Sequence, residues 1–411
     1  MSKLPKSCVR RTLLLVSLMA SVGLTGCASL GAAGEMSASD DRGPSGTTEV
    51  SAGGGSSESE RLRREVRPFA ELGWVLDWTA PLGDADRIEH TQPLGDLVLL
   101  QDDRNVVTVR SATSGGYRWT QQIENPLVNF RGHRRADDVT FEPLGTGERW
   151  EGDALLSVSD TEVFVRDMAT GNLLGRQRFR VPVSTPPLLR GDELIIGTTD
   201  GQLLFHDWRR GVFTKSYGVG GVIRTPPAML ANGDEVVGVS ISGGVAIVDA
   251  STGEAGDRRF EMFAGAAKAP ATDERTAYVA SLDQSVYAFD SVTAQQRWRY
   301  RTDRRLRSAP TAHGGQVFVP VPGTGLVALD SRTGAERWIT EGLDDSEVIA
   351  TRGGELVAWN GSTLRIIESD TGDVIEEIAL PLVSRITPDG FEEASLYVEF
   401  DSGRLARFRT P

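Results

Sequence analysis

The stretch Leu326-Val-Ala-Leu-Asp330-Ser-Arg-Thr333-Gly334-Ala-Glu-Arg-Trp338 decides the fold, because degraded copies of it recur along the chain. The copies align on one residue that closes a short apolar run, namely Arg110, Asp167, Asp207, Asp249, Asp290, Asp330, Glu368 and Arg409. Their spacings are 57, 40, 42, 41, 40, 38 and 41 residues. A period near 40 with apolar strands and Gly-rich turns is typical of propeller blades, whereas helical arrays show 3.6-residue periodicity. The pattern therefore predicts an all-β, eight-bladed β-propeller with four-stranded antiparallel blades.

Each copy supplies the parts of a strand and a tight turn. The run Val245-Ala-Ile-Val-Asp249 is apolar up to its anchor, as expected for a strand buried between stacked blades. The anchor carboxylate can accept hydrogen bonds from backbone N–H groups two or three residues on, and the Thr-Gly pair supplies a hydroxyl and a residue that tolerates positive φ. We interpret five anchors as structural turn caps, one per blade and too dispersed to share a metal ion: Asp167, Asp207, Asp249, Asp290 and Asp330.

A tryptophan follows several anchors at a nearly fixed distance. Trp298 and Trp338 lie eight residues past theirs, and Trp119 lies nine past Arg110. An indole on an outer strand is suited to packing flat against the adjacent blade. We expect these residues to join neighbouring blades.

The two ends of the chain complement each other. The C-terminal stretch 403–411 stops one strand short of a complete unit, and the segment Trp74-Val-Leu-Asp-Trp78 matches the outer strand of the repeat. We therefore expect this N-terminal strand to complete the last blade and close the ring, which removes an open sheet edge.

One interval exceeds the period by about 16 residues, and the excess lies within residues 124–152. Insertions in repeat proteins map to loops on one face, often the binding face. A neutral surface elaboration is the equally open alternative.

The N-terminal segment carries a targeting pattern. Residues 1–26 have a basic start, an apolar run at 13–20 and the ending Leu24-Thr25-Gly26 before Cys27. This resembles a bacterial lipoprotein signal peptide with its lipobox, which implies cleavage before Cys27 and attachment of a lipid anchor, including palmitate, to that cysteine. An ordinary secretory signal with a chance cysteine is the alternative. The apolar run is shorter than the roughly 20 residues that a membrane span requires.

The remaining chain divides into two parts. Residues 27–66 are rich in Gly, Ser, Ala, Thr and Glu and predict a disordered tether with a root-mean-square length of roughly 35 Å. Residues 67–411 contain the repeats and form the predicted propeller domain.

Charge and residue usage exclude several functions. The formal net charge is −13, and an acidic surface repels phosphate backbones, so nucleic acid is not an expected partner. His90, His133, His206 and His313 fall in different units without companion ligands, and we interpret His206 beside Asp207 as a repeat variant. No phosphate-cradling loop, nucleophile elbow or metal-spaced motif is present in the sequence. We predict no catalytic, cofactor-binding or metal-binding residues, and hence no enzyme.

A second element recurs between units, as Ser184-Thr-Pro-Pro187, Arg224-Thr-Pro-Pro227, Lys268-Ala-Pro270 and Arg307-Ser-Ala-Pro310. Proline fits the start of an inner strand near the central channel. The cations beside it would form a modest basic cluster at one end of the channel, although a shared structural position explains them equally well.

The phrase at 328–338 resembles the pyrroloquinoline-quinone-type propeller repeat, and the resemblance covers about residues 70–411. Quinoprotein dehydrogenases of that superfamily carry a vicinal disulfide and a calcium-bound cofactor. The only cysteines here are Cys8 and Cys27, both ahead of the repeats, so the resemblance gives little support to a quinone-dependent enzyme and none to a cofactor.

The lipobox, tether and eight repeats together resemble the lipoprotein B family of the outer-membrane β-barrel assembly machine. The resemblance implies a non-enzymatic scaffold at the outer membrane, facing the periplasm, that binds the barrel-inserting subunit. The position of the family's partner-binding loop reads Val222-Ile223-Arg224 here, about two residues shorter than the family pattern and without its first Leu. Ala28 after Cys27 agrees with sorting to the outer membrane. The alternative is a generic surface or periplasmic propeller that binds an envelope protein or polysaccharide through residues 124–152 and the channel mouth.

Overall fold

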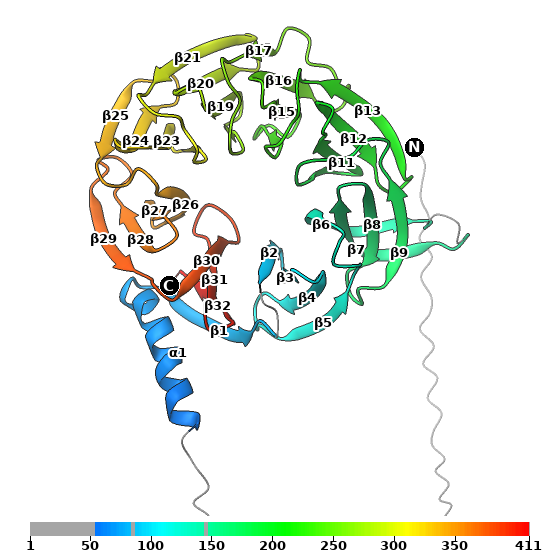
Figure 1. Ribbon diagram of the computed structural model, residues 1–411, viewed down its shortest axis with the longest axis vertical. Helices are drawn as coiled ribbons and strands as arrows, with labels where there is room; N and C mark the ends of the chain where they lie inside the picture. The colour runs from blue at the N-terminus through cyan, green and yellow to red at the C-terminus, as the bar shows by residue number, and fades with distance from the viewer. Residues whose placement is uncertain (1–53, 84–86, 144–146, 411) are drawn as a thin grey trace, which may run out of the picture. The chain divides into compact units, whose positions relative to one another are not determined.

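Eight four-stranded antiparallel sheets form a ring in the part of the chain that the structure describes (Figure 1). The computed structural model describes residues 54–83, 87–143 and 147–410. In seven of the sheets the four strands follow one another both in sequence and in space, as in propeller blades. The predicted eight-bladed β-propeller is confirmed.

The first four blades run from the inner strand to the outer strand in chain order. Blade 1 comprises β2 (Ile88–Leu94), β3 (Leu97–Asp102), β4 (Val106–Ser111) and β5 (Tyr117–Gln122). Blade 2 comprises β6 (Phe130–Phe141), β7 (Trp150–Ser159), β8 (Glu162–Asp167) and β9 (Leu173–Arg178). Blade 3 comprises β10 (Leu188–Arg190), β11 (Glu193–Gly197), β12 (Gln202–Asp207) and β13 (Val212–Gly218). Blade 4 comprises β14 (Ala228–Met229), β15 (Glu235–Val239), β16 (Gly244–Asp249) and β17 (Arg259–Glu261).

The other four blades complete the ring. Blade 5 comprises β18 (Ala271–Thr272), β19 (Thr276–Ser281), β20 (Ser285–Asp290) and β21 (Gln295–Arg301). Blade 6 comprises β22 (Thr311–His313), β23 (Gln316–Val321), β24 (Gly325–Asp330) and β25 (Glu336–Thr340). Blade 7 comprises β26 (Glu347–Arg352), β27 (Glu355–Trp359), β28 (Thr363–Ile367) and β29 (Val374–Ala379). Blade 8 comprises β30 (Val383–Pro388), β31 (Leu396–Phe400), β32 (Arg404–Arg409) and the N-terminal strand β1 (Val75–Pro81).

Blade 8 closes the ring with strands from both ends of the chain. Strand β1 pairs antiparallel with β32, from Val75 opposite Arg409 to Pro81 opposite Arg404, as the blue and red ends of the ribbon show in Figure 1. Asp77 on β1 also binds Arg407 on β32, at 2.8 Å. The predicted closing strand is confirmed, and β1 covers the edge that β32 would otherwise leave unpaired.

A helix precedes the closing strand. Helix α1 (Gly54–Glu71) places Glu65 and Phe69 on one face, Leu72 follows its last residue, and all three side chains are buried. The ring of Phe69 stacks on Phe408 of β32 with centroids 4.2 Å apart, and Glu65 lies 3.3 Å from Arg404. The helix is therefore packed onto blade 8.

This helix corrects the predicted domain boundaries. A disordered tether over 27–66 is wrong for residues 54–66, which are helical, and the expected boundary at residue 67 falls inside α1. Overall composition concealed the helix, because a few apolar residues at helical spacing suffice once blade 8 offers a surface to cover. The signal peptide at 1–26, Cys27 and the tether up to residue 53 lie outside the described residues. No helix in the described ranges is long and apolar enough to cross a membrane.

Tryptophans join neighbouring blades as expected. The indole N–H of Trp119 donates to the Met168 carbonyl at 2.9 Å, and that of Trp338 donates to the Ser369 carbonyl at 3.0 Å. Trp298 and Trp78 make the same bond to Ser331 and Ala112, at 2.9 and 2.8 Å. In each case an outer strand binds the turn of the next blade, so the repeated Trp is a link between blades.

The predicted Asp anchors cap turns. A carboxylate oxygen of Asp249 accepts the N–H groups of Ser251 and Thr252, at 2.8 and 2.9 Å. The bonds with Ser251 and Thr252 lower the pKa of Asp249 to about 2. Equivalent N–H bonds reach the other anchors: Asp167 from Ala169, Asp207 from Arg210, Asp290 from Val292 and Thr293, and Asp330 from Arg332 and Thr333. These residues hold the fold and lie apart from one another.

The insertion forms a long hairpin. Strands β6 and β7 of blade 2 have 12 and 10 residues and pair outward as far as Phe141 opposite Trp150, whereas β8 pairs with β7 only from Ala154 to Val158. The hairpin therefore extends beyond its blade. The Phe141 ring lies against Trp208 of blade 3, with centroids 5.5 Å apart. The extra residues predicted within 124–152 thus contribute to the core as well as to the surface.

Candidate protein-docking face

The connections between blades share one face of the ring with the turn between the second and third strands of each blade, because consecutive strands run in opposite directions. We call this the docking face. The segment 219–227 between β13 and β14 lies on it and contains the predicted partner-binding residues Val222, Ile223 and Arg224. The Asp anchors occupy the turns of the opposite face.

The three predicted residues differ in accessibility. Ile223 is fully buried, its N–H donates to the Thr198 carbonyl at 3.2 Å, and its own carbonyl accepts a hydrogen bond from the Ser184 hydroxyl. Its side chain therefore anchors the segment inside the protein instead of facing a partner. Val222 is partly exposed and Arg224 is exposed, so these two side chains are available for binding.

Three successive elements of the docking face are tied together through their backbones. The N–H of Ile241, in the turn between β15 and β16, donates to the Val222 carbonyl at 2.9 Å. The N–H of Gly265, in the connection from β17 to β18, donates to the Ile241 carbonyl at 3.2 Å. Gly265 is required here, because a Cβ on it would lie 2.3 Å from the Ser240 carbonyl oxygen. The segments are thus fixed before any partner arrives.

Large apolar side chains project from these elements. Phe263 is 83% exposed and Ile241 is 46% exposed, although both belong to segments held by hydrogen bonds. The Phe263 N–H donates to the Asp283 carboxylate at 3.0 Å, and the Arg299 guanidinium lies 5.3 Å from the centre of the Phe263 ring. We call Val222, Ile241 and Phe263 the apolar row. Apolar surface on a rigid, partly charged loop layer is typical of a protein-binding site.

The predicted basic cluster is only partly free. Lys268 lies 3.9 Å from Glu347, whereas Arg224 and Arg307 have no ion pair within the described ranges. A pocket of about 460 Å³ opens beside Val222 and Arg224 and is also lined by Arg131, Ser184 and Thr199. Positive charge therefore collects at one edge of the apolar row.

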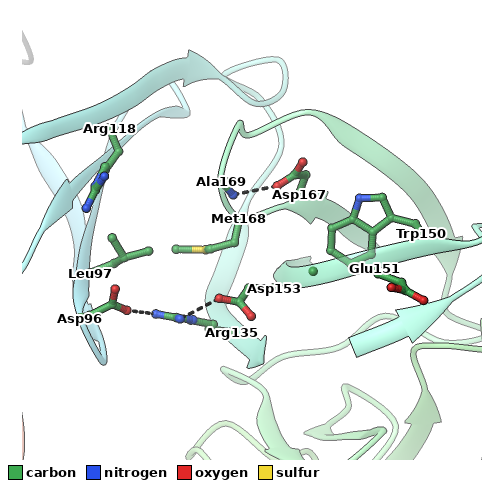
Figure 2. Close-up of a pocket in the computed structure, with 11 residues that line it drawn as sticks. Asp96, Leu97, Arg118, Arg135, Trp150, Glu151, Asp153, Asp167, Met168 and Ala169 are labelled. Atoms are coloured by element: carbon green, nitrogen blue, oxygen red, sulfur yellow. Dashed lines mark hydrogen bonds and ion pairs between the residues drawn. The ribbon is translucent and has the colours of Figure 1, made fainter. Parts of the chain in front are cut away.

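A second pocket, of about 360 Å³, lies on the opposite face where the long hairpin leaves blade 2. Figure 2 shows Arg135 between Asp96 and Asp153, with Trp150 across the pocket from Leu97. Arg135 binds Asp153 at 2.8 Å and also pairs with Asp96, which holds the pKa of Asp96 below its usual value. The pocket has an apolar floor and a largely acidic rim, on which Arg135 is paired with carboxylates and Arg118 is a second cation.

His133 and His206 occupy structural positions. His133 is fully buried, with Nδ1 2.9 Å from the Ser157 hydroxyl and Nε2 2.5 Å from the Gln101 amide oxygen. His206 is bound to Gln177 at 2.8 Å and makes no dyad with Asp207. Burial lowers the pKa of His206 to about 4 and that of His133 well below 6.5. Both rings are neutral parts of polar contacts between blades. In the described ranges, no three His, Cys, Asp or Glu side chains gather as a metal site.

The sequence argument singled out the segment around Val222–Arg224 and did not point to Ile241 or Phe263, which are the more exposed apolar residues beside it. Ile241 and Phe263 lie in a turn and a connection, outside the repeated motif on which the argument was built. A signal was present, since large apolar residues are unusual in exposed connections. These exposed residues can be distinguished from core residues only once the limits of the strands are known.

Comparison with known proteins places this fold in a family. The sequence model described as outer membrane protein assembly factor BamB matches residues 103–260 and 259–388, which is more than half of the chain. A search of the curated proteins gave no match.

Solved structures share the architecture. The crystal structure of BamB from Moraxella catarrhalis has a TM-score of 0.59 at 16% identity, and the match covers 82% of this chain and 99% of that one. The computationally designed Ika8 protein has a TM-score of 0.61 at 14% identity, with 79% of this chain and 96% of that one covered. At such identities the likeness shows the fold alone.

Proposed function

Because the chain belongs to the outer membrane protein assembly factor BamB family, we propose that it is a non-enzymatic scaffold that aids the assembly and insertion of outer-membrane β-barrel proteins. The observation that carries this proposal is the apolar row on the docking face. It combines exposed apolar side chains with backbone segments fixed by hydrogen bonds, which lowers the entropy cost of binding a protein.

The partner we propose is the barrel-inserting subunit of the assembly machine. Arg224 and the partly exposed Val222 lie at one end of the apolar row, and Phe263 lies at the other end as a large aromatic anchor. Aromatic and arginine side chains contribute most to protein interfaces. The docking face has both kinds within three connected segments.

We further propose that the protein is a lipoprotein, anchored through Cys27 to the outer membrane and facing the periplasm. The lipobox-like ending before Cys27 and the Ala28 that follows support this location. Mass spectrometry of the protein from membranes should find Cys27 acylated and residues 1–26 removed. An unmodified Cys27 would contradict the anchor without affecting the docking proposal.

Photo-crosslinking tests the docking proposal directly. With a photoreactive residue at position 241 or 263 of the full chain in a bacterial envelope, we expect an adduct with the barrel-inserting subunit. Ile241→Asp and Phe263→Asp should each reduce its recovery in a pull-down about 30-fold, because an anchor residue of an interface contributes about 2 kcal/mol.

The matched control is Val292→Asp. Val292 is 68% exposed but lies in the turn between β20 and β21, on the opposite face. This variant should recover the partner as well as the unaltered chain does. Equal losses at 292 and 263, or no recovery with any chain, would refute the docking proposal.

A second candidate function is favoured by the pocket beside the long hairpin, which would bind an envelope protein or a polysaccharide. Trp150 and the acidic rim would carry such binding. Trp150→Ser should then abolish retention on envelope material and leave partner recovery through the docking face unchanged.

A further inference from the structure

Three consecutive blades place different side chains at one equivalent position beside the docking face. Phe130 pairs with Ser159 at the start of β6, whereas Val183 with Thr198 and Ile223 with Ser240 form isolated bridges ahead of the inner strands β10 and β14. The residues that follow are Arg131, Ser184 and Arg224 in blades 2, 3 and 4. Two arginines therefore flank a small serine.

These three equivalent residues line the same pocket of about 460 Å³, together with Thr199 and Val222. The short Ser184 side chain leaves space between its two long neighbours, and its hydroxyl is bound to the Ile223 carbonyl. No Asp or Glu lines this pocket. Its charge is therefore purely positive on a protein whose net charge is −13.

Arg131 differs from all the other arginines that are buried or partly buried in the described part of the chain. Those arginines each have a hydrogen bond, an ion pair or an aromatic contact, whereas Arg131 has none. A guanidinium group that is taken partly out of water is costly unless other groups pair with it. Arg131 lines a pocket that also contains a second arginine without an ion pair in the described ranges, Arg224.

A local irregularity of β6 directs Arg131 into this position. The pairing of β6 with β7 shifts between Phe130 and Gly132, so Arg131 is the extra residue of a β-bulge. Gly132 has a φ of 155°, which few other residues adopt. Bulges commonly re-aim one side chain and are frequent beside binding sites.

We propose that Arg131 and Arg224 form a two-armed anion site that binds a carboxylate of the partner protein docked on the apolar row. Two guanidinium groups can donate several charge-assisted hydrogen bonds to one carboxylate, and both are more weakly hydrated than ammonium groups. The source of the carboxylate rests on the proposed function. The anion site itself rests only on the pocket.

The site can be tested on the full chain without a partner. With ¹⁵N-labelled arginine, the side-chain N–H signals of Arg131 and Arg224 should shift saturably with sodium acetate and should not respond to acetamide. Arg131→Gln should weaken acetate binding at Arg224 at least tenfold. Arg307→Gln, which removes another exposed, unpaired arginine of the same face, should leave it unchanged.

Two results would overturn the proposal. Shifts that rise linearly with acetate, or that are equal at Arg307, would mean that no built site exists. Inorganic phosphate binding tenfold or more tightly than acetate would mean that the site selects a phosphate group instead of a carboxylate. Neither result depends on the apolar row.

The partner experiment separates the two proposals. If the anion site serves docking, Arg131→Gln should reduce recovery of the barrel-inserting subunit. For the unaltered chain, 0.5 M sodium acetate should also reduce this recovery, to an extent set by the affinity of the site for acetate. Recovery unchanged by Arg131→Gln, in a chain that binds acetate, would refute the partner's carboxylate as the ligand while the docking proposal stands.

Discussion

The indole of Trp338 lies so close over Gly372 that a Cβ on residue 372 would come within 2.5 Å of the ring. Gly372 also has a φ of 79°, which side chains rarely adopt. Trp298 over Gly334 and Trp78 over Gly115 repeat the arrangement at other blade interfaces. The Thr-Gly turn is therefore constrained by its neighbour as well as by its own backbone.

Gly372→Ala should destabilise the propeller by about 2 to 4 kcal/mol, because it combines an unfavourable φ with overlap against a buried ring. The measurement is the urea midpoint of unfolding. Gly361→Ala is the control, since Gly361 has a φ of 94° but nothing within 4 Å of a built Cβ. It should cost about 1 kcal/mol, from the backbone alone. Equal losses of stability in the two variants would show that the Trp338 indole moves aside at no cost in free energy.

Phe69→Ala should loosen the closing blade, although residue 69 precedes its first strand. Its ring is fully buried and stacks on Phe408, so its loss should cost about 3 to 4 kcal/mol. Arg63→Ala on the exposed side of α1 should change stability by less than about 0.5 kcal/mol. Thermal unfolding of both variants checks this, and a neutral Phe69→Ala would mean that α1 is not needed for closure.

Stability should fall as pH drops from about 6.5 to about 4, partly through His206. Burial depresses its folded pKa to about 4 from 6.5, so the unfolded chain binds a proton first. The contribution of the neutral His206 ring to the free energy of unfolding is fully present above pH 6.5. Up to about 3 kcal/mol of it is lost as the pH falls towards 4. Urea unfolding at several pH values should show a weaker decline for His206→Gln. An identical decline would assign the effect to other groups.

Phe141→Ala should destabilise the protein although Phe141 belongs to the insertion. The side chain is buried between Trp150 and Trp208, and its removal should cost about 3 kcal/mol. Trp150→Ser should cost clearly less, since Trp150 is partly exposed. Equal, negligible effects in urea unfolding would mean that the hairpin is a detachable surface feature.

The repeat made the architecture predictable, because one period carries strands, turns and links between blades together. The eight blades, the Asp caps, the interblade tryptophans and the closing strand at Val75–Pro81 all depend on it. Features that the repeat does not encode were harder to predict. Helix α1 depends on a surface that exists only after blade 8 forms, and composition alone gave a tether.

The candidate site was predicted less well, for a physical reason. The burial of Ile223 follows from its pairing with Ser240, a contact between distant residues that local sequence cannot reveal. Ile241 and Phe263 can be recognised as exposed apolar residues only when core strands have been distinguished from the connections between them. The unpaired state of Arg131 depends on a bulge and on the absence of acids around one pocket, which is a property of the assembled blades.

The position of α1 determines where mechanical load enters the protein. A pull on the chain before Gly54 reaches the helix first, and the helix is held to blade 8 by Phe69 on Phe408 and by Glu65 beside Arg404. These contacts lie on β32, the partner of β1. Tension is thus shared between side-chain packing and the strand pairs of the seam, so the ring can resist being drawn open by its own N-terminal segment.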